Sequence, residues 1–263
     1  MKKLKALIFD VDGTLADTER DGHRVAFNHA FKHAGLSWSW DEEIYGELLA
    51  VTGGKERIRF FMERYQPPSA PKTGLDEFIK SLHQRKTRYF VELLESGAIP
   101  LRAGVDRLIK EARAANLKLG IATTTTPENV TALLKATLGE ESINWFEFIA
   151  AGDVVANKKP SPDIYLYALQ AMHLAADECL AFEDSNNGLM ASMQAGLQTV
   201  VTVNAYTRHE DFSGAALVLD QLGEPGSSFE VLVGDAGGAS HVDVRLIERI
   251  FDANKQSIDN RAS

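Results

Sequence analysis

The feature that most constrains the fold is a regular alternation of short apolar segments with helix-like ones over the second part of the chain. Such alternation is typical of a parallel sheet whose strands are joined by helices. The expected helices are 105–114, 127–137, 162–171 and 188–195, and the expected strands between them are 117–122, 148–151, 179–182 and 199–203. The apolar run 6–9 indicates one more buried strand of the same sheet. We therefore predict an α/β fold with a parallel sheet flanked by helices.

The stretch from residue 17 to about 96 has a different character. Apolar residues recur there at helical spacing, and the pattern gives no convincing strand. We predict a helical domain at 17–96, inserted after the first strand, and a core domain made of residues 1–16 and 97–263. Within the core, the Gly- and Ser-rich residues 223–240 are expected to form a long loop, and 242–253 a last helix.

A negative net charge limits the partners of the chain. The 263 residues include 37 Asp and Glu against 28 Lys and Arg, which gives a net charge of −9 and a pI near 5.3. Non-specific attraction to nucleic acid or to an anionic membrane is not expected, and an anionic substrate needs a local cluster of positive charge. The N-terminal apolar run is too short for a signal peptide or membrane span, and the single cysteine, Cys179, cannot form an internal disulfide. We expect a soluble, cytoplasmic, monomeric protein.

Four polar clusters each follow a predicted strand or the loop after it. They are Asp10-Val11-Asp12, Thr123-Thr124-Thr125-Thr126, Lys158-Lys159-Pro160 and Glu183-Asp184-Ser185-Asn186-Asn187. The carboxyl ends of parallel strands share one edge of a sheet, where ligands bind, so the four clusters can meet in one crevice. Taken alone, each cluster has an ordinary explanation, such as an Asp-Gly turn at the first, a helix N-cap at Thr126 or a solvated loop end at the last.

The acidic residues of these clusters point to a metal ion. Gathered together, Asp10, Asp12, Glu183 and Asp184 would repel one another by about 4 kcal/mol per pair at 4 Å and an effective dielectric near 20. A bound cation removes this repulsion. A site of carboxylate oxygens, completed by water and a substrate phosphate, suits Mg²⁺ rather than Zn²⁺.

The same groups suit phosphoryl transfer. A carboxylate beside Mg²⁺ can attack phosphorus, and Asp10 is the candidate nucleophile. Asp12 can protonate the leaving oxygen and then deprotonate the attacking water, provided that the crowded site raises its pKa. The ammonium of Lys159 and the hydroxyl of Thr123 would neutralise the charge on the phosphoryl oxygens.

The order of the four clusters resembles the signature of the haloacid dehalogenase (HAD) phosphatase superfamily. The matching segments are DVDGTLADTE, the strand that ends in Thr123, KKPSPDIY and EDSNNG. The resemblance implies a Rossmann-like core, an α-helical cap of the C1 type, an Asp nucleophile and an Asp acid/base. It also implies Mg²⁺ held by the Asp10 side chain, the Asp12 main-chain carbonyl and the Asp184 side chain, with Glu183 orienting metal-bound water.

Three further segments resemble the CbbY-type branch of that superfamily: DTERDGHRVAFN, TGGKERI and YTRHEDFSGA. Members are linked to autotrophic carbon fixation through the Calvin cycle, and relatives dephosphorylate xylulose 1,5-bisphosphate, an inhibitor of Rubisco. The resemblance implies a Mg²⁺-dependent sugar-phosphate phosphatase that works through an aspartyl phosphate. The alternative enzyme is a phosphosugar mutase similar to β-phosphoglucomutase, which uses the same motifs and cap. A signalling receiver also carries a phosphorylated Asp among acidic residues, a Thr or Ser and a Lys. Receivers are much shorter than this chain, however, and have no cap.

Candidate substrate contacts lie in the predicted cap and beside the threonine run. Glu19 and His23 follow the first motif, although many relatives carry the His one residue earlier, where this chain has Gly22. One residue rotates a helical position by about 100°, so the spacing leaves the contact of His23 open. In 52–57, glycine amides at a helix start can bind an anion, and we predict that Lys55 or Arg57 holds a second phosphate. Thr124 and Thr125 complete the predicted substrate set.

Overall fold

One sheet of seven strands organises the core. The structure is a computed structural model that describes residues 3–71 and 73–262, with side chains as far as residue 253. The strand order is β3-β2-β1-β4-β5-β6-β7, and all neighbours are parallel except β6 and β7. The strands are β1 Ala6–Phe9, β2 Lys118–Ala122, β3 Phe148–Ala150, β4 Cys179–Glu183, β5 Gln198–Thr202, β6 Leu217–Leu219 and β7 Val231–Val233.

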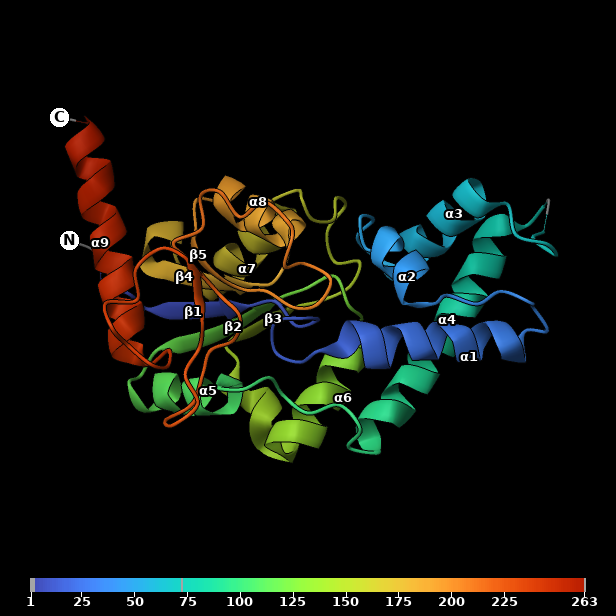
Figure 1. Cartoon of the computed structure of the whole chain (residues 1–263), viewed down its shortest axis with the longest axis horizontal. Coiled ribbons are helices and arrows are strands. Elements are labelled where there is room, and N and C mark those ends of the chain that lie inside the picture. Colours follow the sequence, from blue (N-terminus) through green and yellow to red (C-terminus); the bar gives the residue numbers. More distant parts are fainter. Residues whose placement is uncertain (1–2, 72, 263) are drawn as a thin grey trace.

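Helices cover both faces of this sheet (Figure 1). Alternate side chains of a strand point to opposite faces, so Leu7 and Phe9 lie in one apolar cluster and Ala6 and Ile8 in another. The first cluster includes α5 (Val105–Ala114), α6 (Pro127–Leu138) and α9 (Val244–Ala262), and the second includes α7 (Asp163–Met172) and α8 (Asn186–Gln194). The core therefore has three layers. Full burial of a side chain such as Phe9 contributes about 1.5–3 kcal/mol to this packing.

The predicted α/β class is confirmed, and the strands predicted from the alternation all form. The prediction was wrong near the C-terminus, because β6 was not foreseen and the expected loop 223–240 contains β7. Both strands have only three residues, and Val231 and Val233 of β7 are 39% and 53% exposed. An edge strand held by backbone pairing leaves little apolar pattern in the sequence.

The region 17–96 packs around a hydrophobic centre of its own. Its helices are α1 Arg24–His33, α2 Glu42–Leu48, α3 Gly54–Tyr65 and α4 Leu75–Glu95, preceded by a π-helical turn at Glu19–His23. Phe27, Phe31, Trp40 and Phe61 form an aromatic cluster between them. Figure 1 shows these helices as a lobe to one side of the sheet, which we call the cap. The exact limits of the two domains stay a prediction.

The two chain segments that join core and cap lie side by side. Ala16 and Leu101 form an isolated antiparallel bridge, and the backbone N–H of Arg102 donates to the carbonyl of Leu15 at 2.9 Å. The remaining short elements are 3₁₀ turns at Glu140–Trp145 and Ala176–Glu178. Among the described residues, no helix has both the length and the apolar character to span a membrane.

Candidate active site

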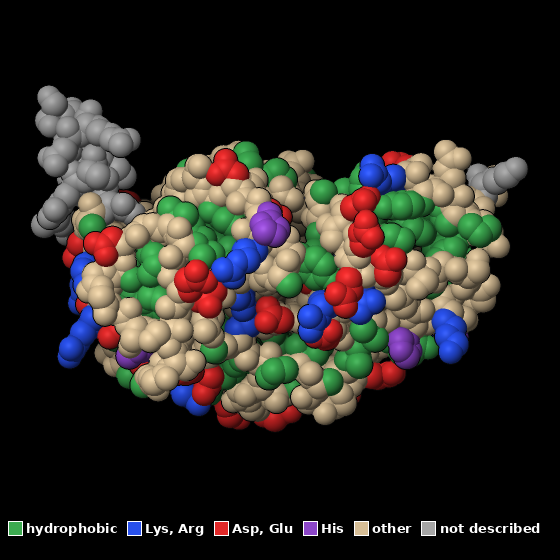
Figure 2. Space-filling model, in the orientation of Figure 1, with side chains coloured by type: hydrophobic (Ala, Val, Ile, Leu, Met, Phe, Trp, Pro, Cys, Tyr) green, Lys and Arg blue, Asp and Glu red, His purple; other side chains and the backbone are tan. Residues whose placement is uncertain are grey.

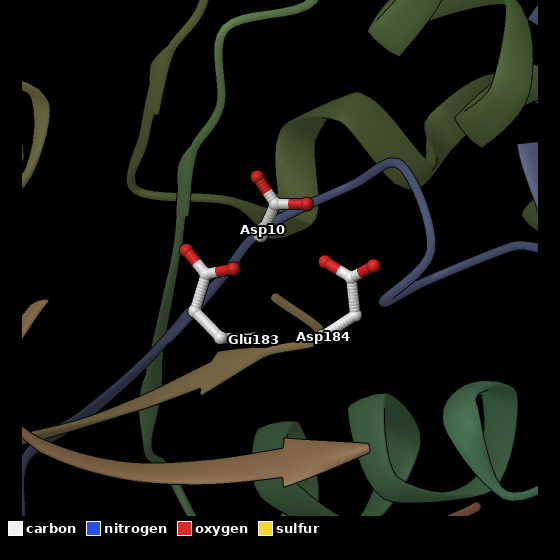
Figure 3. Close-up of side chains that lie close together, drawn as sticks. All are labelled: Asp10, Glu183 and Asp184. Carbon is white, nitrogen blue, oxygen red and sulfur yellow. The ribbon is translucent and has the colours of Figure 1, made fainter. Parts of the chain in front are cut away.

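Three acidic side chains meet where β1 and β4 end. The two strands are parallel neighbours with Phe9 opposite Phe182, so the next residues, Asp10 and Glu183, come side by side. One ligand atom from each of Asp10, Glu183 and Asp184 lies within 4.8 Å of the others, and all three residues are buried. Figure 3 shows the three carboxyl groups side by side at these strand ends. The structure thus brings together groups that are about 170 residues apart in the sequence.

Lys159 provides the positive charge of this cluster. It lies between β3 and α7, is 6% exposed, and its Nζ is 2.6 Å from Asp10 Oδ1 and 2.6 Å from Glu183 Oε1. Tyr165 also donates its hydroxyl to Glu183 Oε1. Lys159 is therefore part of the site and not a solvated surface residue, which was its ordinary alternative.

One lysine does not balance three carboxylates. Burial raises the pKa of Asp10 to about 8, although the Lys159 charge pulls it down, and burial also holds the pKa of Asp184 well above its ordinary value. Glu183 Oε2 is buried and has no hydrogen-bond partner among the described residues. A cluster of carboxylate oxygens with excess negative charge and a free acceptor fits a hard divalent cation.

Two glycines make room for the acids. At Gly13, which has a φ of +88°, an added Cβ would lie 2.1 Å from Asp184 Oδ2. At Gly188 an added Cβ would lie 1.9 Å from Glu183 Oε2. The glycines of the first and last clusters are therefore needed for space around the carboxylates, beyond any role in turning the chain.

Asp12 faces the cap. Its Oδ1 accepts hydrogen bonds from Thr18 Oγ1 at 2.6 Å and His23 Nε2 at 2.7 Å. Burial alone would raise the pKa of Asp12, but the electrostatic interaction with His23 and the bonds from His23 and Thr18 outweigh it and hold the pKa well below its ordinary value. The expectation of a raised pKa was therefore wrong. The reason is a partner from the cap, which the acidic crowding of the sequence did not reveal.

The π-helical turn explains how His23 reaches this position. A π-helix uses i→i+5 hydrogen bonds and so accommodates one residue more than an α-helical turn. The turn at Glu19–His23 absorbs the extra residue noted in the sequence, and His23 ends up buried against Asp12. Its other ring nitrogen, Nδ1, lies 2.5 Å from Lys86 Nζ, and its ring stacks on Phe90.

The predicted threonines line the space between core and cap. Thr123 and Thr124 line the pocket over the acids, which we call the catalytic pocket, together with Asp10, Lys159 and Asp184. Thr124 and Thr125 line an adjoining polar pocket that we call the cap pocket. The hydroxyl of Thr125 accepts from Asn129 Nδ2 at 2.9 Å. Figure 2 shows charged side chains gathered along the waist between the two lobes.

Two of the predicted cap contacts take part in one buried network. Arg57 lines both pockets, and its Nη1 donates to the Tyr45 hydroxyl at 2.8 Å and lies 3.5 Å from Glu19 Oε2. Tyr45 in turn donates to Glu19. Lys55 is placed differently, because it lines neither pocket and pairs with Asp153 of the core.

Lys86 and Tyr45 are site residues that the sequence reasoning missed. Lys86 is 3% exposed, and burial lowers its pKa to about 8 although Asp12 and Glu19 raise it. A signal was present: along α4 the buried residues are Ile79, Leu82, Lys86, Phe90 and Leu94, so a lysine occupies a position of the apolar stripe. A charged residue at such a position is rarely buried without a partner.

A buried acidic cluster paired with a lysine at the strand ends of an α/β core, under a helical cap, defines a hydrolase of the haloacid dehalogenase type. The model of the haloacid dehalogenase-like hydrolase family matches residues 4–196, and the chain belongs to that family. Within it, the chain belongs to the CbbY-like branch. It is 47% identical over 238 residues to protein CbbY of Cupriavidus necator, which covers 90% of this chain and 92% of the relative.

Solved structures agree with the sequence relatives. CbbY from Rhodobacter sphaeroides in complex with phosphate has a TM-score of 0.78 and 48% identity, covering 83% of this chain and 94% of that one. A mutant of the same protein, in complex with xylulose 1,5-bisphosphate, has a TM-score of 0.78 and 47% identity over the same shares. The core is thus Rossmann-like as predicted, and the chain is a phosphatase.

Proposed function

We propose that this phosphatase is Mg²⁺-dependent, hydrolyses a sugar bisphosphate through a phosphorylated Asp10, and acts on xylulose 1,5-bisphosphate. The observation that carries the proposal is the buried group of Asp10, Glu183 and Asp184, with Lys159 Nζ 2.6 Å from two of them. The structure of a 47% identical protein with xylulose 1,5-bisphosphate supports the choice of sugar.

The acidic cluster would hold the metal ion. We assign the Asp10 and Asp184 side chains and the Asp12 main-chain carbonyl as protein ligands, and Glu183 as the residue that orients bound water. When bound, Mg²⁺ supplies positive charge that permits a carboxylate to approach a phosphate and that stabilises charge on the phosphoryl oxygens. The free Glu183 Oε2 is consistent with its assignment, since an acceptor there can hold a water.

The first step transfers the phosphoryl group to the protein. A carboxylate oxygen of Asp10 bonds to phosphorus while the bond from phosphorus to the sugar oxygen breaks, and Asp12 gives that oxygen a proton. Lys159 already lies beside Asp10 Oδ1, so its ammonium is in place to neutralise the incoming phosphate. Thr123, at the end of β2, would donate its hydroxyl to a phosphoryl oxygen.

The second step releases phosphate. Asp12 takes a proton from water, the water oxygen bonds to phosphorus, and the bond from phosphorus to Asp10 breaks. The hydrogen bonds from His23 and Thr18 favour the ionised form of Asp12, which is the form this step requires. Asp12 gives up this proton to solvent after phosphate leaves, and it takes one up again when the negative charge of a new substrate enters the pocket and raises its pKa.

Arg57 would bind the second phosphate. It is 7% exposed, lines both pockets and keeps a fixed direction through Tyr45. The cap pocket also includes Gly53 and Gly54 at the start of α3, where backbone N–H groups favour an anion. Glu19, His23, Thr124 and Thr125 would contact the sugar between the two phosphates.

A phosphate-release screen tests the proposal. Pentulose and hexose mono- and bisphosphates are assayed with and without Mg²⁺, with Asp12→Ala as the control. We expect xylulose 1,5-bisphosphate to give the highest kcat/KM and release to stop when the metal is chelated. If generic monophosphates react equally well, the assignment of xylulose 1,5-bisphosphate is wrong, and only the assignment as a phosphatase remains.

A second assay addresses the mutase alternative. β-glucose 1-phosphate is supplied together with glucose 1,6-bisphosphate, and products are followed with free phosphate. Isomerisation without net phosphate release would identify a phosphosugar mutase. We expect the opposite, because the similarity to CbbY is much closer than the 25% identity to a putative β-phosphoglucomutase of Thermotoga maritima.

A further inference from the structure

We propose that Asn204 is a positioning residue for Asp184, whose carboxylate it holds in the orientation that binds the divalent cation. The inference rests on the proposed function, since it takes Asp184 as a cation ligand. Asn204 follows β5, outside all four polar clusters of the sequence. Its Nδ2 donates to Asp184 Oδ2 at 2.7 Å.

The orientation of the Asn204 amide is fixed by its own loop. Oδ1 accepts from the backbone N–H of Tyr206 at 2.8 Å and of Thr207 at 3.2 Å. The backbone N–H of Asn204 in turn donates to Thr207 Oγ1 at 3.0 Å. Because two backbone donors occupy the oxygen side of the amide, the NH₂ side must face Asp184.

The backbone at Gly13 leaves room for this pair. An added Cβ at Gly13 would lie 2.1 Å from Asp184 Oδ2 and 2.8 Å from Asn204 Nδ2. The carboxylate and the amide therefore meet in a space that a larger residue at 13 would fill. The first polar cluster thus contributes both the nucleophile and the room for the Asp184–Asn204 contact.

Arg102 ties these segments to each other. Its Nη1 donates to the carbonyls of Gly13 and Thr202, the latter at 2.9 Å, and its Nη2 donates to the carbonyl of Val203 at 2.6 Å. One guanidinium therefore fixes the loop that carries Gly13 relative to the residues just before Asn204. Arg102 therefore holds the backbone that leads into Asn204, and the N–H groups of the following turn hold the oxygen of its amide.

The contact has a direct consequence for cation binding. Figure 3 shows one oxygen of Asp184 turned toward Asp10 and Glu183, and with Oδ2 bound by Asn204 the oxygen left for that position is Oδ1. Replacing a group that orients a metal ligand typically weakens metal affinity by about 10–100-fold. Without the amide, Asp184 would have to be ordered when the cation binds, which weakens binding.

The test measures Mg²⁺ binding directly. Asn204→Ser keeps an oxygen that can accept from the N–H groups of the turn but is too short to reach Asp184. Isothermal titration calorimetry without substrate should show a Mg²⁺ Kd about 10–100-fold higher than in the wild type. The Mg²⁺ concentration for half-maximal activity should rise in parallel, while kcat at saturating Mg²⁺ stays within about threefold.

Asn144→Ser is the matched control, because it makes the same replacement at an exposed position of the turn Glu140–Trp145, where the amide donates to Glu141. Its Mg²⁺ Kd should stay within twofold of the wild type. If Asn204→Ser does not fold, Asn204→Thr, which keeps more side-chain volume, carries the same expectation. Equal Kd values for wild type and the Asn204 variant would overturn the positioning role, whereas a wild type that binds no Mg²⁺ would overturn the proposed function itself.

Discussion

The floor of the catalytic pocket and the cap above it are built in different ways. On the floor, Asp10 and Glu183 are adjacent because β1 and β4 pair in register, with the backbone N–H of Asp10 donating to the Phe182 carbonyl at 3.0 Å. In the cap, His23, Arg57 and Lys86 come from three separate helical segments. Strand pairing fixes the floor through backbone hydrogen bonds, whereas the cap depends on how helices pack. We infer that the floor performs the chemistry and the cap selects the substrate.

The strongest test of this division is Asp10→Asn. Loss of the nucleophile should lower phosphate release by at least about 10⁴-fold, because the remaining groups cannot form the covalent intermediate. The variant should fold at least as stably as the wild type, since Asn cannot ionise and so avoids the cost that burial places on the Asp10 carboxylate. Steady-state kinetics and thermal unfolding measure the two effects. Activity within tenfold of the wild type would end the proposal that Asp10 is the nucleophile.

The sequence revealed most of the floor and little of the cap. Asp10, Thr123, Lys159 and Asp184 each follow a strand or its loop, and the parallel arrangement of strand ends implied that they meet. Lys86 could not be paired with His23 in the same way, because the contact joins two helices whose relative packing no local pattern specifies. The short strands β6 and β7 were missed for a related reason, since three residues carry too little periodicity to be recognised.

The two basic side chains that were predicted to bind a second phosphate, Lys55 and Arg57, have different positions in the structure, so we expect different effects when they are replaced. Arg57→Ala should raise KM for the bisphosphate about 30-fold, equivalent to about 2 kcal/mol for a charge-assisted contact, and KM for a monophosphate far less. Lys55→Ala should change either KM less than threefold, because Lys55 pairs with Asp153 instead. Initial-rate kinetics on the bisphosphate and the monophosphate measure these changes in KM. Equal effects of Arg57→Ala on the two substrates would show that the cap does not recognise the second phosphate.

His23→Gln tests the contact that links the cap to the floor. Gln keeps a donor for Asp12 but removes the imidazole whose interaction lowers the Asp12 pKa, so that pKa should rise by at least about one unit, equivalent to about 1.4 kcal/mol. We expect kcat/KM to fall about tenfold as the contact across the pocket weakens. A ¹³C NMR titration of the side-chain carboxyls in metal-free protein measures the pKa. His33→Gln, on the exposed end of α1, is the control and should leave the pKa of Asp12 unchanged. An unchanged pKa of Asp12 in His23→Gln would mean that this cap residue does not influence the floor.

The smallest expected effect concerns stability, and it separates the two regions by the sign of their pH dependence. The folded-state pKa of Asp10 is raised to about 8, with burial as the main cause, so its contribution to stability is present below the unfolded value near 4 and is lost as the pH rises toward 8. The pKa of Asp12 is lowered, so its contribution is constant above about pH 5. Metal-free protein should therefore lose at least about 1 kcal/mol between pH 5 and 7.5, or roughly 2–4 °C in Tm. Asp10→Asn should flatten this slope, and so should Mg²⁺, which favours the ionised carboxylates. A metal-free Tm that stays constant or rises over this range would show that the crowded acids of the floor do not ionise as their burial predicts.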